Sequence, residues 1–150
     1  MWMHNARNEP LQAAIAELGP TRRVNSCFTF AGGPEFFTDN IRVRNDGTGD
    51  PLGCLGDLGW YNTRACLFAM EYKKPLWAAA HAHANDAGVS MALTATLGYE
   101  GCLCTFDCGF ETFGRSWLEV AGTEGVINLS GFTGGGPRPG LCRPGGQGCF

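Results

Sequence analysis

The segment GDLGWY, residues 56–61, carries the two side chains of this sequence that are best placed for chemistry. On a helix, Asp57 and Tyr61 are four positions apart and share one face. The carboxylate can accept hydrogen bonds from substrate hydroxyls, and the phenol can donate a proton to a carbonyl oxygen or relay one. The structural alternative is that Asp57 stabilises the positive end of the helix while Tyr61 is half-buried core. The spacing by itself leaves both interpretations open.

A helix must position these two side chains, and residues 54–70 predict one because they lack proline and run for about five turns. Glycines at positions 53, 56 and 59 weaken the helical propensity at its start by roughly 1 kcal/mol each relative to alanine. We therefore expect these glycines to serve either close backbone packing or a ligand near the helix N-terminus.

The chain before this helix predicts three further segments. Residues 8–18 carry one apolar stripe at helical spacing, with Asn8 as a candidate cap and Gly-Pro at the end. Residues 22–30 predict a strand. Residues 31–52 are rich in Gly, Pro, Asn and Asp, and predict a loop with a short extended piece at 41–44.

The chain after this helix changes to the period of two that is typical of strands. Short breaks between the strands favour antiparallel meander pairing over crossover helices. We expect an α+β fold, a mostly antiparallel sheet with helices packed on one face, over residues 1–130. We expect the Gly/Pro-rich residues 131–150 to be a disordered tail. The five predicted strands are 76–84, 89–98, 102–110, 115–121 and 125–130.

Length and charge exclude several classes of protein. The 150 residues, 44% of them apolar, suffice for one domain with a buried core. A net charge of -3 without a Lys/Arg stripe disfavours nucleic-acid binding. The longest apolar run falls short of the roughly 20 residues of a membrane helix, so we expect no membrane span. Residues 1–10 lack the apolar core of a signal peptide, so we expect a cytoplasmic protein.

The eight cysteines are most simply explained as free thiols in the core, because no signal peptide points to an oxidising compartment. A zinc site would require Cys102, Cys104 and Cys108 to meet His81 and His83 across two strands. The spacings are CxC and HxH, not the CxxC of a zinc knuckle, and strand alternation alone explains them. Nucleophilic catalysis by a Cys–His pair also lacks an orienting third group.

Four segments, in this order along the chain, resemble the second domain of the glucose–fructose oxidoreductase/inositol dehydrogenase (Gfo/Idh/MocA) family. The strongest is DPLGCLGDLGWYNTRACLFAM, residues 50–70, which contains the family's Asp-x-Gly-x-His/Tyr pattern in its tyrosine form. That form resembles the dihydrodiol- and xylose-dehydrogenase-like branch. The other three are MWMHNARNEPLQAAIAELGPTRRVNSCFTF, NIRVRNDGTGDPLG and CLCTFDCGFETFGRSWLEVAGTEGVINL, and the resemblance covers about residues 1–130.

The family's cofactor-binding parts have no counterpart in this sequence. Family members begin with a Rossmann domain, whose glycine loop reads GxGxxG directly after a strand. The glycines at 53, 56 and 59 read GxxGxxG inside a predicted helix, and Lys73-Lys74-Pro75 follows that helix and is not the family's catalytic Lys segment. We therefore expect a truncated chain. Complete members use NAD(P), and we expect neither cofactor to bind this chain alone.

The resemblance implies a role for four residues. Tyr61 would be the acid/base of an NAD(P)-dependent oxidoreductase, Asp57 would bind substrate hydroxyls, and His4 and Asn5 would border the pocket. The substrate would be a sugar, a polyol or a diol. The open face of the sheet would pair two copies, or this chain with a full-length relative. The alternative is a non-catalytic module that interacts through its sheet.

Overall fold

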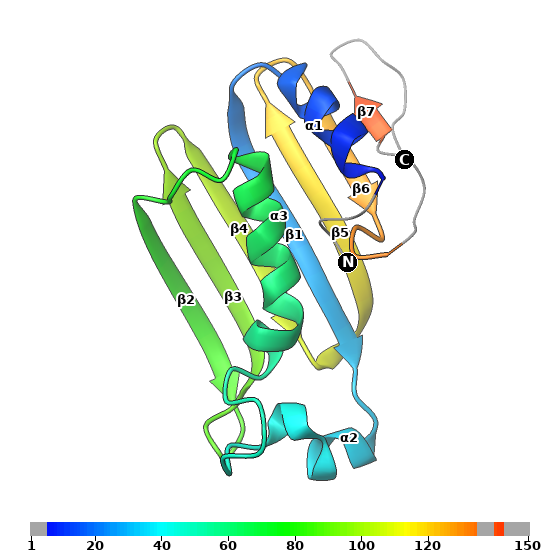
Figure 1. The fold of residues 1–150 in the computed structure, drawn as a ribbon, viewed down its shortest axis with the longest axis vertical. Helices are drawn as coiled ribbons and strands as arrows, with labels where there is room; N and C mark the ends of the chain where they lie inside the picture. The colour runs from blue at the N-terminus through cyan, green and yellow to red at the C-terminus, as the bar shows by residue number, and fades with distance from the viewer. Residues whose placement is uncertain (1–5, 135–139, 143–150) are drawn as a thin grey trace.

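Seven strands form one sheet in the order β2-β3-β4-β1-β5-β6-β7 (Figure 1). The structure is a computed structural model and describes residues 6–134 and 140–142, the last three in backbone only. All neighbouring strands are antiparallel except β1 and β4, which are parallel. The elements are α1 (Asn8–Ala16), β1 (Thr21–Ala31), α2 (Pro34–Asp39), η2 (Ile41–Val43), η3 (Leu55–Gly59), α3 (Trp60–Ala69), β2 (Trp77–Ala84), β3 (Ser90–Tyr99), β4 (Cys102–Gly109), β5 (Glu111–Gly122), β6 (Val126–Ser130) and β7 (Gly140–Cys142).

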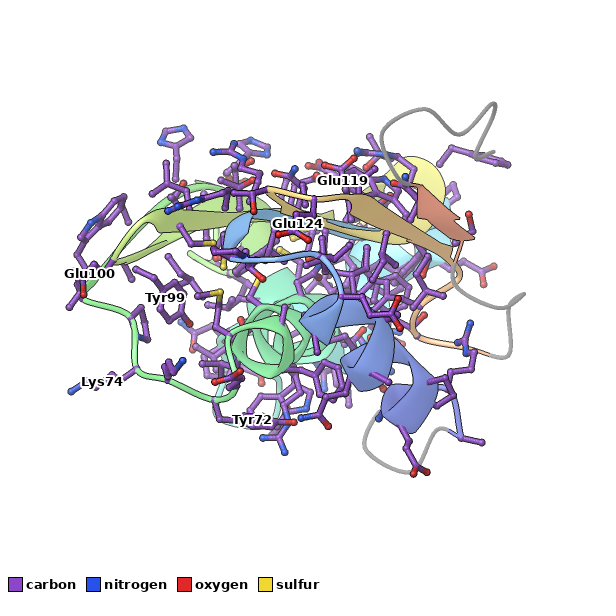
Figure 2. All side chains as sticks on the ribbon, turned by 90° about the horizontal axis from the view of Figure 1, so that it is seen from above. Tyr72, Lys74, Tyr99, Glu100, Glu119 and Glu124 are labelled. Carbon is purple, nitrogen blue, oxygen red and sulfur yellow. The ribbon has the colours of Figure 1, made fainter. Side chains whose placement is uncertain are left out.

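Helices α1 and α3 cover one face of this sheet, and α3 packs on β1 and β4 (Figures 1 and 2). The strands alternate accordingly, so that every second side chain of β3, from Met91 to Tyr99, is buried on the helix side. Figure 2 shows Tyr99 on that side and Glu119 on the opposite, open face. The expected α+β class, with a mostly antiparallel sheet behind the helices, is confirmed.

The position of β1 differs from a simple meander. β1 lies between β4 and β5, although only Phe110 separates those two strands in sequence. The chain passes around the end of β1, where the Gly32 N–H donates to the Phe110 carbonyl at 2.7 Å and the β1–β5 register shifts between Thr29 and Ala31. Strands adjacent in sequence usually pair, so short breaks alone could not indicate this insertion.

The expectation of a loop over residues 31–52 is wrong for two segments. Residues Pro34–Asp39 form α2, and residues Ile41–Val43 form a 3₁₀ turn where we predicted an extended piece. Tertiary packing explains α2: the Phe36 ring lies 5.3 Å from that of Phe30 and 5.0 Å from that of Phe110, between ring centroids. Phe110 is distant in sequence, so local composition could not indicate the helix.

Both ends of the described chain also differ from expectation. Arg7, not Asn8, occupies the N-cap of α1. Near the other end, Phe132 is fully buried and its ring lies 6.2 Å from that of Phe28, so the core extends past residue 130. Residues Gly140–Cys142 pair with β6 as β7. The prediction of disorder is therefore wrong for 131–134 and 140–142, and the rest of the tail lies outside the described residues.

The cysteines follow the expectation as far as the structure describes them: six are buried free thiols, namely Cys27, Cys54, Cys66, Cys102, Cys104 and Cys108. On the helix side, the small thiols of Cys54, Cys104 and Cys108 let a helix and the sheet approach closely. Across the described ranges, no helix is both long enough and apolar enough to traverse a bilayer.

Burial raises the pKa of three side chains in the sheet, two cysteine thiols and one tyrosine hydroxyl. The pKa of Cys27 rises to about 12, first through burial and then through its hydrogen bond with Asp107, at 3.3 Å. Burial likewise raises the pKa of Cys102 and of Tyr99 to about 12. All three groups therefore stay protonated in the folded chain at pH values where they ionise in the unfolded chain.

This difference predicts alkaline instability. Above pH 9 the unfolded chain releases protons from its thiols, while the folded chain retains those of Cys27 and Cys102 to about pH 12. The folded state then binds more protons, so the free energy of unfolding falls as pH rises from about 9 to 12. Urea unfolding at several pH values should show this fall. The fall should be shallower for Cys27→Ser, and an identical pH dependence would contradict our explanation.

Candidate functional site

The predicted helix over residues 54–70 is present, but it begins with a π-helical turn, η3, before α3. The glycines here serve close packing. Gly53 has φ +54°, and a Cβ on it would lie 2.3 Å from the Ser90 carbonyl oxygen. A Cβ on Gly59 would lie 3.1 Å from the Cys108 Sγ. For Gly53 and Gly59 the structure supports close packing against the sheet, whereas a Cβ on Gly56 would meet the Asp50 side chain. π-helical turns are rare and often occur at functional sites.

Asp57 lies in this turn and forms an ion pair with Arg42, with 2.8 Å between Oδ2 and Nε. The Arg42 backbone N–H in turn donates to the side chain of Asn40 at 3.0 Å, which orders the segment that carries the guanidinium. Both charged side chains are partly exposed, so the pair contributes at most about 1 kcal/mol to folding. Its main effect is to fix the direction of the Asp57 carboxylate.

Tyr61 lies on the first turn of α3 and is half-buried. Its ring meets the Phe28 ring of β1 edge to face, with 5.6 Å between centroids. Since Phe28 also contacts Phe132, aromatic packing holds the Tyr61 ring against the sheet. Asp57 and Tyr61 therefore occupy adjacent turns of one helix but contact different elements. No hydrogen bond joins them within the described chain.

Three large apolar side chains are exposed on segments next to Asp57 or Arg42 in the sequence. Ile41 precedes Arg42 and is 55% exposed, Leu52 precedes the π turn and is 56% exposed, and Trp60 follows it and is 63% exposed. We name Ile41, Leu52 and Trp60 the Asp57 rim.

Sequence reasoning missed a buried polar contact beneath this site. Asn62, one residue after Tyr61, is fully buried, and its Nδ2 donates to the Oγ of Ser26 in β1 at 2.9 Å. This hydrogen bond joins α3 to β1 and so fixes the rotation of the helix that carries Tyr61. The one available signal was an amide inside a helix face that is otherwise apolar. Arg42 carried no signal, because its role depends on the tertiary fold.

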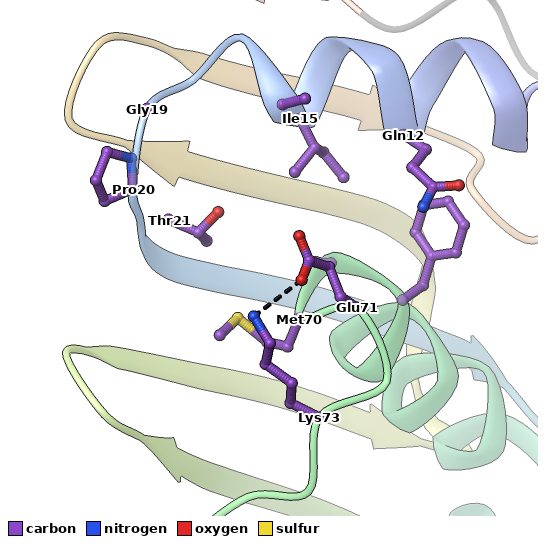
Figure 3. A pocket seen from close by; sticks show the side chains of 11 residues that line it. Gln12, Ile15, Gly19, Pro20, Thr21, Met70, Glu71 and Lys73 are labelled. Atoms are coloured by element: carbon purple, nitrogen blue, oxygen red, sulfur yellow. Dashed lines mark ion pairs between the residues drawn. The ribbon is translucent and has the colours of Figure 1, made fainter.

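A cavity of about 530 Å³ lies elsewhere, between α1 and the C-terminal end of α3 (Figure 3). Ile15 and Met70 contribute apolar walls, and an ion pair of 2.9 Å joins Glu71 to Lys73 at its edge. Asp57 and Tyr61 lie at the other end of the helix and do not line it. The cavity is therefore separate from the predicted site.

The remaining candidates are the two predicted pocket residues and the possible zinc ligands. His4 and Asn5 lie outside the described residues, so their predicted place at the pocket stays a prediction. Cys104 and Cys108 are buried on the helix side of β4, whereas His83 lies on the fully exposed β2 and contacts Glu111 at 3.3 Å. In the part of the chain that the structure describes, no three His, Cys, Asp or Glu side chains are grouped as metal ligands.

No family model matches the chain. The fold does match solved oxidoreductases. The 3-ketoreductase KijD10 from Actinomadura kijaniata, in complex with NADP and TDP-benzene, matches with a TM-score of 0.79 and 22% identity over 97% of this chain and 45% of that one. The aldose-aldose oxidoreductase from Caulobacter crescentus, complexed with glycerol, matches with a TM-score of 0.74 and 19% identity over 99% of this chain and 47% of that one.

GenD2 from gentamicin A biosynthesis, in complex with NAD, matches with a TM-score of 0.68 and 24% identity over 83% of this chain and 35% of that one. The chain thus spans less than half the length of each of these three structures. The likeness shows the fold: this chain has the α+β architecture of the C-terminal domain of these oxidoreductases.

The glycine packing predicts different costs for two substitutions to alanine. Gly47 and Gly53 both have positive φ, at +83° and +54°, but only Gly53 meets another backbone. Gly47→Ala should lower the free energy of unfolding by about 1 kcal/mol through backbone strain alone. Gly53→Ala should lower it by ~3 kcal/mol or more, because the β3 carbonyl must also move. Urea denaturation measures both, and equal losses would show that Gly53 is not held against the sheet.

The Asn62–Ser26 contact predicts energetic coupling between α3 and β1. Asn62→Ala should destabilise by about 2–3 kcal/mol, because it leaves a cavity and an unpaired buried hydroxyl. In a double-mutant cycle with Ser26→Ala, the coupling should be about 1 kcal/mol. Asn128→Ala, at an exposed position of β6, is the control and should change stability by less than about 0.5 kcal/mol. Additive effects of the two core substitutions would mean that the hydrogen bond contributes nothing.

Proposed function

We propose that this chain is the substrate-binding domain of an NAD(P)-dependent oxidoreductase of the Gfo/Idh/MocA type, acting on a sugar, a polyol or a diol. The observation that carries the proposal is the pattern Asp57-x-Gly59-x-Tyr61 at the start of a helix packed behind the sheet. Structures with the same fold hold NADP with TDP-benzene, glycerol or NAD. The proposal joins the sequence pattern to that shared architecture.

In this proposal the two side chains have separate tasks. Asp57, directed by Arg42, accepts hydrogen bonds from substrate hydroxyls and so selects a polyhydroxylated substrate. Tyr61 holds or delivers a proton at the substrate oxygen that changes between alcohol and carbonyl. Its ring is fixed by Phe28, so the phenol needs little reorganisation when the substrate is bound.

The residues of this chain do not fit the phosphates of a dinucleotide. That fit requires a glycine loop directly after a strand, with its backbone N–H groups free. Gly53 and Gly59 instead pack against Ser90 and Cys108 of the sheet. We therefore assign nucleotide binding to another domain, and the exposed Asp57 rim supports a covering domain at that place.

For the open face of the sheet we propose a role in assembly. Its centre is polar and already ordered: the Asn25 Nδ2 donates to the Glu119 carboxylate at 2.8 Å, and Arg115 pairs with Asp107 at 2.9 Å. Asn25, Asp107 and Arg115, with the partly exposed Trp117, line a shallow hollow of about 320 Å³. Ordered polar groups beside an aromatic ring suit an interface with a second copy. Six buried free thiols agree with a reducing compartment such as the cytoplasm.

A second candidate function is an interaction module without catalysis. The observation that favours it is β2, an edge strand whose eight residues are all exposed. Exposed edge strands readily pair with strands of other chains. Equilibrium dialysis with NAD and NADP, which measures cofactor binding, followed by sedimentation, which measures self-association, distinguishes the two proposed functions. Micromolar cofactor binding to the chain alone would contradict our assignment of the nucleotide site to another domain.

The catalytic role of Tyr61 is testable in a protein in which a cofactor-binding domain is joined to this chain. DNA upstream of Met1 that encodes a strand–GxGxxG–helix in frame would identify that domain. Tyr61→Phe removes only the hydroxyl. It should lower kcat by about 10²–10⁴-fold, because proton transfer loses its donor, while the Kd for the nucleotide stays unchanged.

Tyr72→Phe is the matched control, because Tyr72 is exposed just beyond α3 and its ring can keep its place near the Arg64 guanidinium. This variant should retain nearly full turnover. Unchanged kcat in Tyr61→Phe would remove Tyr61 from the mechanism. Equal losses in both variants would indicate a general effect on the helix.

A further inference from the structure

Buried thiols join the helix that carries Asp57 to strand β4 at two places. At the start of the helix, the Sγ atoms of Cys54 and Cys108 lie 3.9 Å apart. Further along, the thiols of Cys66 and Cys104 also share a hydrogen bond. Cys104 and Cys108 are both on the helix side of β4, because side chains four positions apart in a strand share a face. Helix and strand therefore present paired sulfurs to each other.

The two sulfurs of the Cys54–Cys108 pair are already close. Forming a disulfide would shorten the distance between them from 3.9 Å to about 2.05 Å. Gly59 faces the same sulfur, and a Cβ there would lie 3.1 Å from the Cys108 Sγ. The missing side chain leaves Cys108 free to turn toward Cys54.

The two thiols are also chemically unequal. The Cys108 thiol donates its hydrogen bond to the Cys54 sulfur, which lowers the pKa of Cys54. The same bond, together with burial, raises the pKa of Cys108. Of the two, the Cys54 thiol therefore forms a thiolate more readily, and the neighbouring Cys108 thiol can react with an oxidised Cys54 to form a disulfide.

We propose that Cys54 and Cys108 are a redox-active thiol pair that hydrogen peroxide oxidises to a disulfide. The Cys54 thiolate attacks one peroxide oxygen, the O–O bond breaks, and a sulfenic acid forms; the hydroxide that leaves takes up the proton that the Cys54 thiol released and becomes the first water. The Cys108 sulfur then attacks the Cys54 sulfur, the S–O bond breaks, and a second water leaves. Two thiols and one peroxide thus give one disulfide and two waters.

This inference goes beyond the proposed function and does not depend on it. The disulfide would link Cys54, three positions before Asp57, to β4 and so hold the π turn on the sheet. It would also close a long loop of the unfolded chain. The oxidised chain should therefore melt ~10 °C higher than the reduced chain.

The test treats the folded chain with hydrogen peroxide, blocks the remaining thiols with an alkylating reagent and maps the crosslinks by mass spectrometry. Cleavage by trypsin and Asp-N places the relevant cysteines on separate peptides. Cys54 falls in residues 50–56, Cys66 in 65–73, Cys104 in 86–106 and Cys108 in 107–115. We expect peptide 50–56 joined to peptide 107–115, and a melting temperature that returns to its starting value after reduction.

Two variants and one condition serve as controls. Cys108→Ser should lose both the crosslink and the shift in melting temperature. Cys27→Ser should keep both, although it also changes a buried thiol, one that is hydrogen-bonded to Asp107. In urea the crosslinks should scatter over several cysteines. A folded chain whose Cys54 and Cys108 stay unlinked, or that links other cysteines instead, overturns the proposal. Because wild-type chain gives this result directly, poor folding of a variant does not affect it.

Discussion

The close approach of one helix to one sheet determines most of this structure. Small residues take up much of the contact between the π turn, α3 and the sheet, among them Gly59, Ala65 and Cys66 of the helix and Cys104 and Cys108 of β4. Gly53 touches the backbone of β3, and Gly59 touches the thiol of Cys108. Within this apolar contact, Asn62 and Ser26 supply one polar connection that fixes the helix in rotation. The directions of Asp57 and Tyr61 follow from this arrangement.

The sheet separates two environments. Its helix side is apolar, and burial there keeps Cys102 and Tyr99 protonated well beyond their ordinary range. Its open side carries hydrogen-bonded polar groups, such as Thr105, whose hydroxyl donates to the Asn25 side chain at 2.6 Å. Asp107 lies on this open side and pairs with Arg115. One strand therefore faces the core with one set of residues and the open side of the sheet with the other.

The candidate site combines two kinds of support. Asp57 is held by charge, through Arg42, whereas Tyr61 is held by ring packing on Phe28. These supports come from η2 and β1, so the site depends on the fold of the whole first half of the chain. The apolar side chains of the Asp57 rim remain exposed to solvent.

The sequence by itself determined the local features. Periodicity placed the main strands, because one apolar face repeats at a fixed interval in each, and a proline-free run of about five turns indicated the helix that carries Asp57 and Tyr61. Only the tertiary structure decided which elements meet. The insertion of β1 beside β4, the helix around Phe36 and the Arg42–Asp57 ion pair all depend on partners distant in sequence. Such contacts leave no periodic trace along the chain, since they are stabilised by burial and pairing that exist only once the chain has folded.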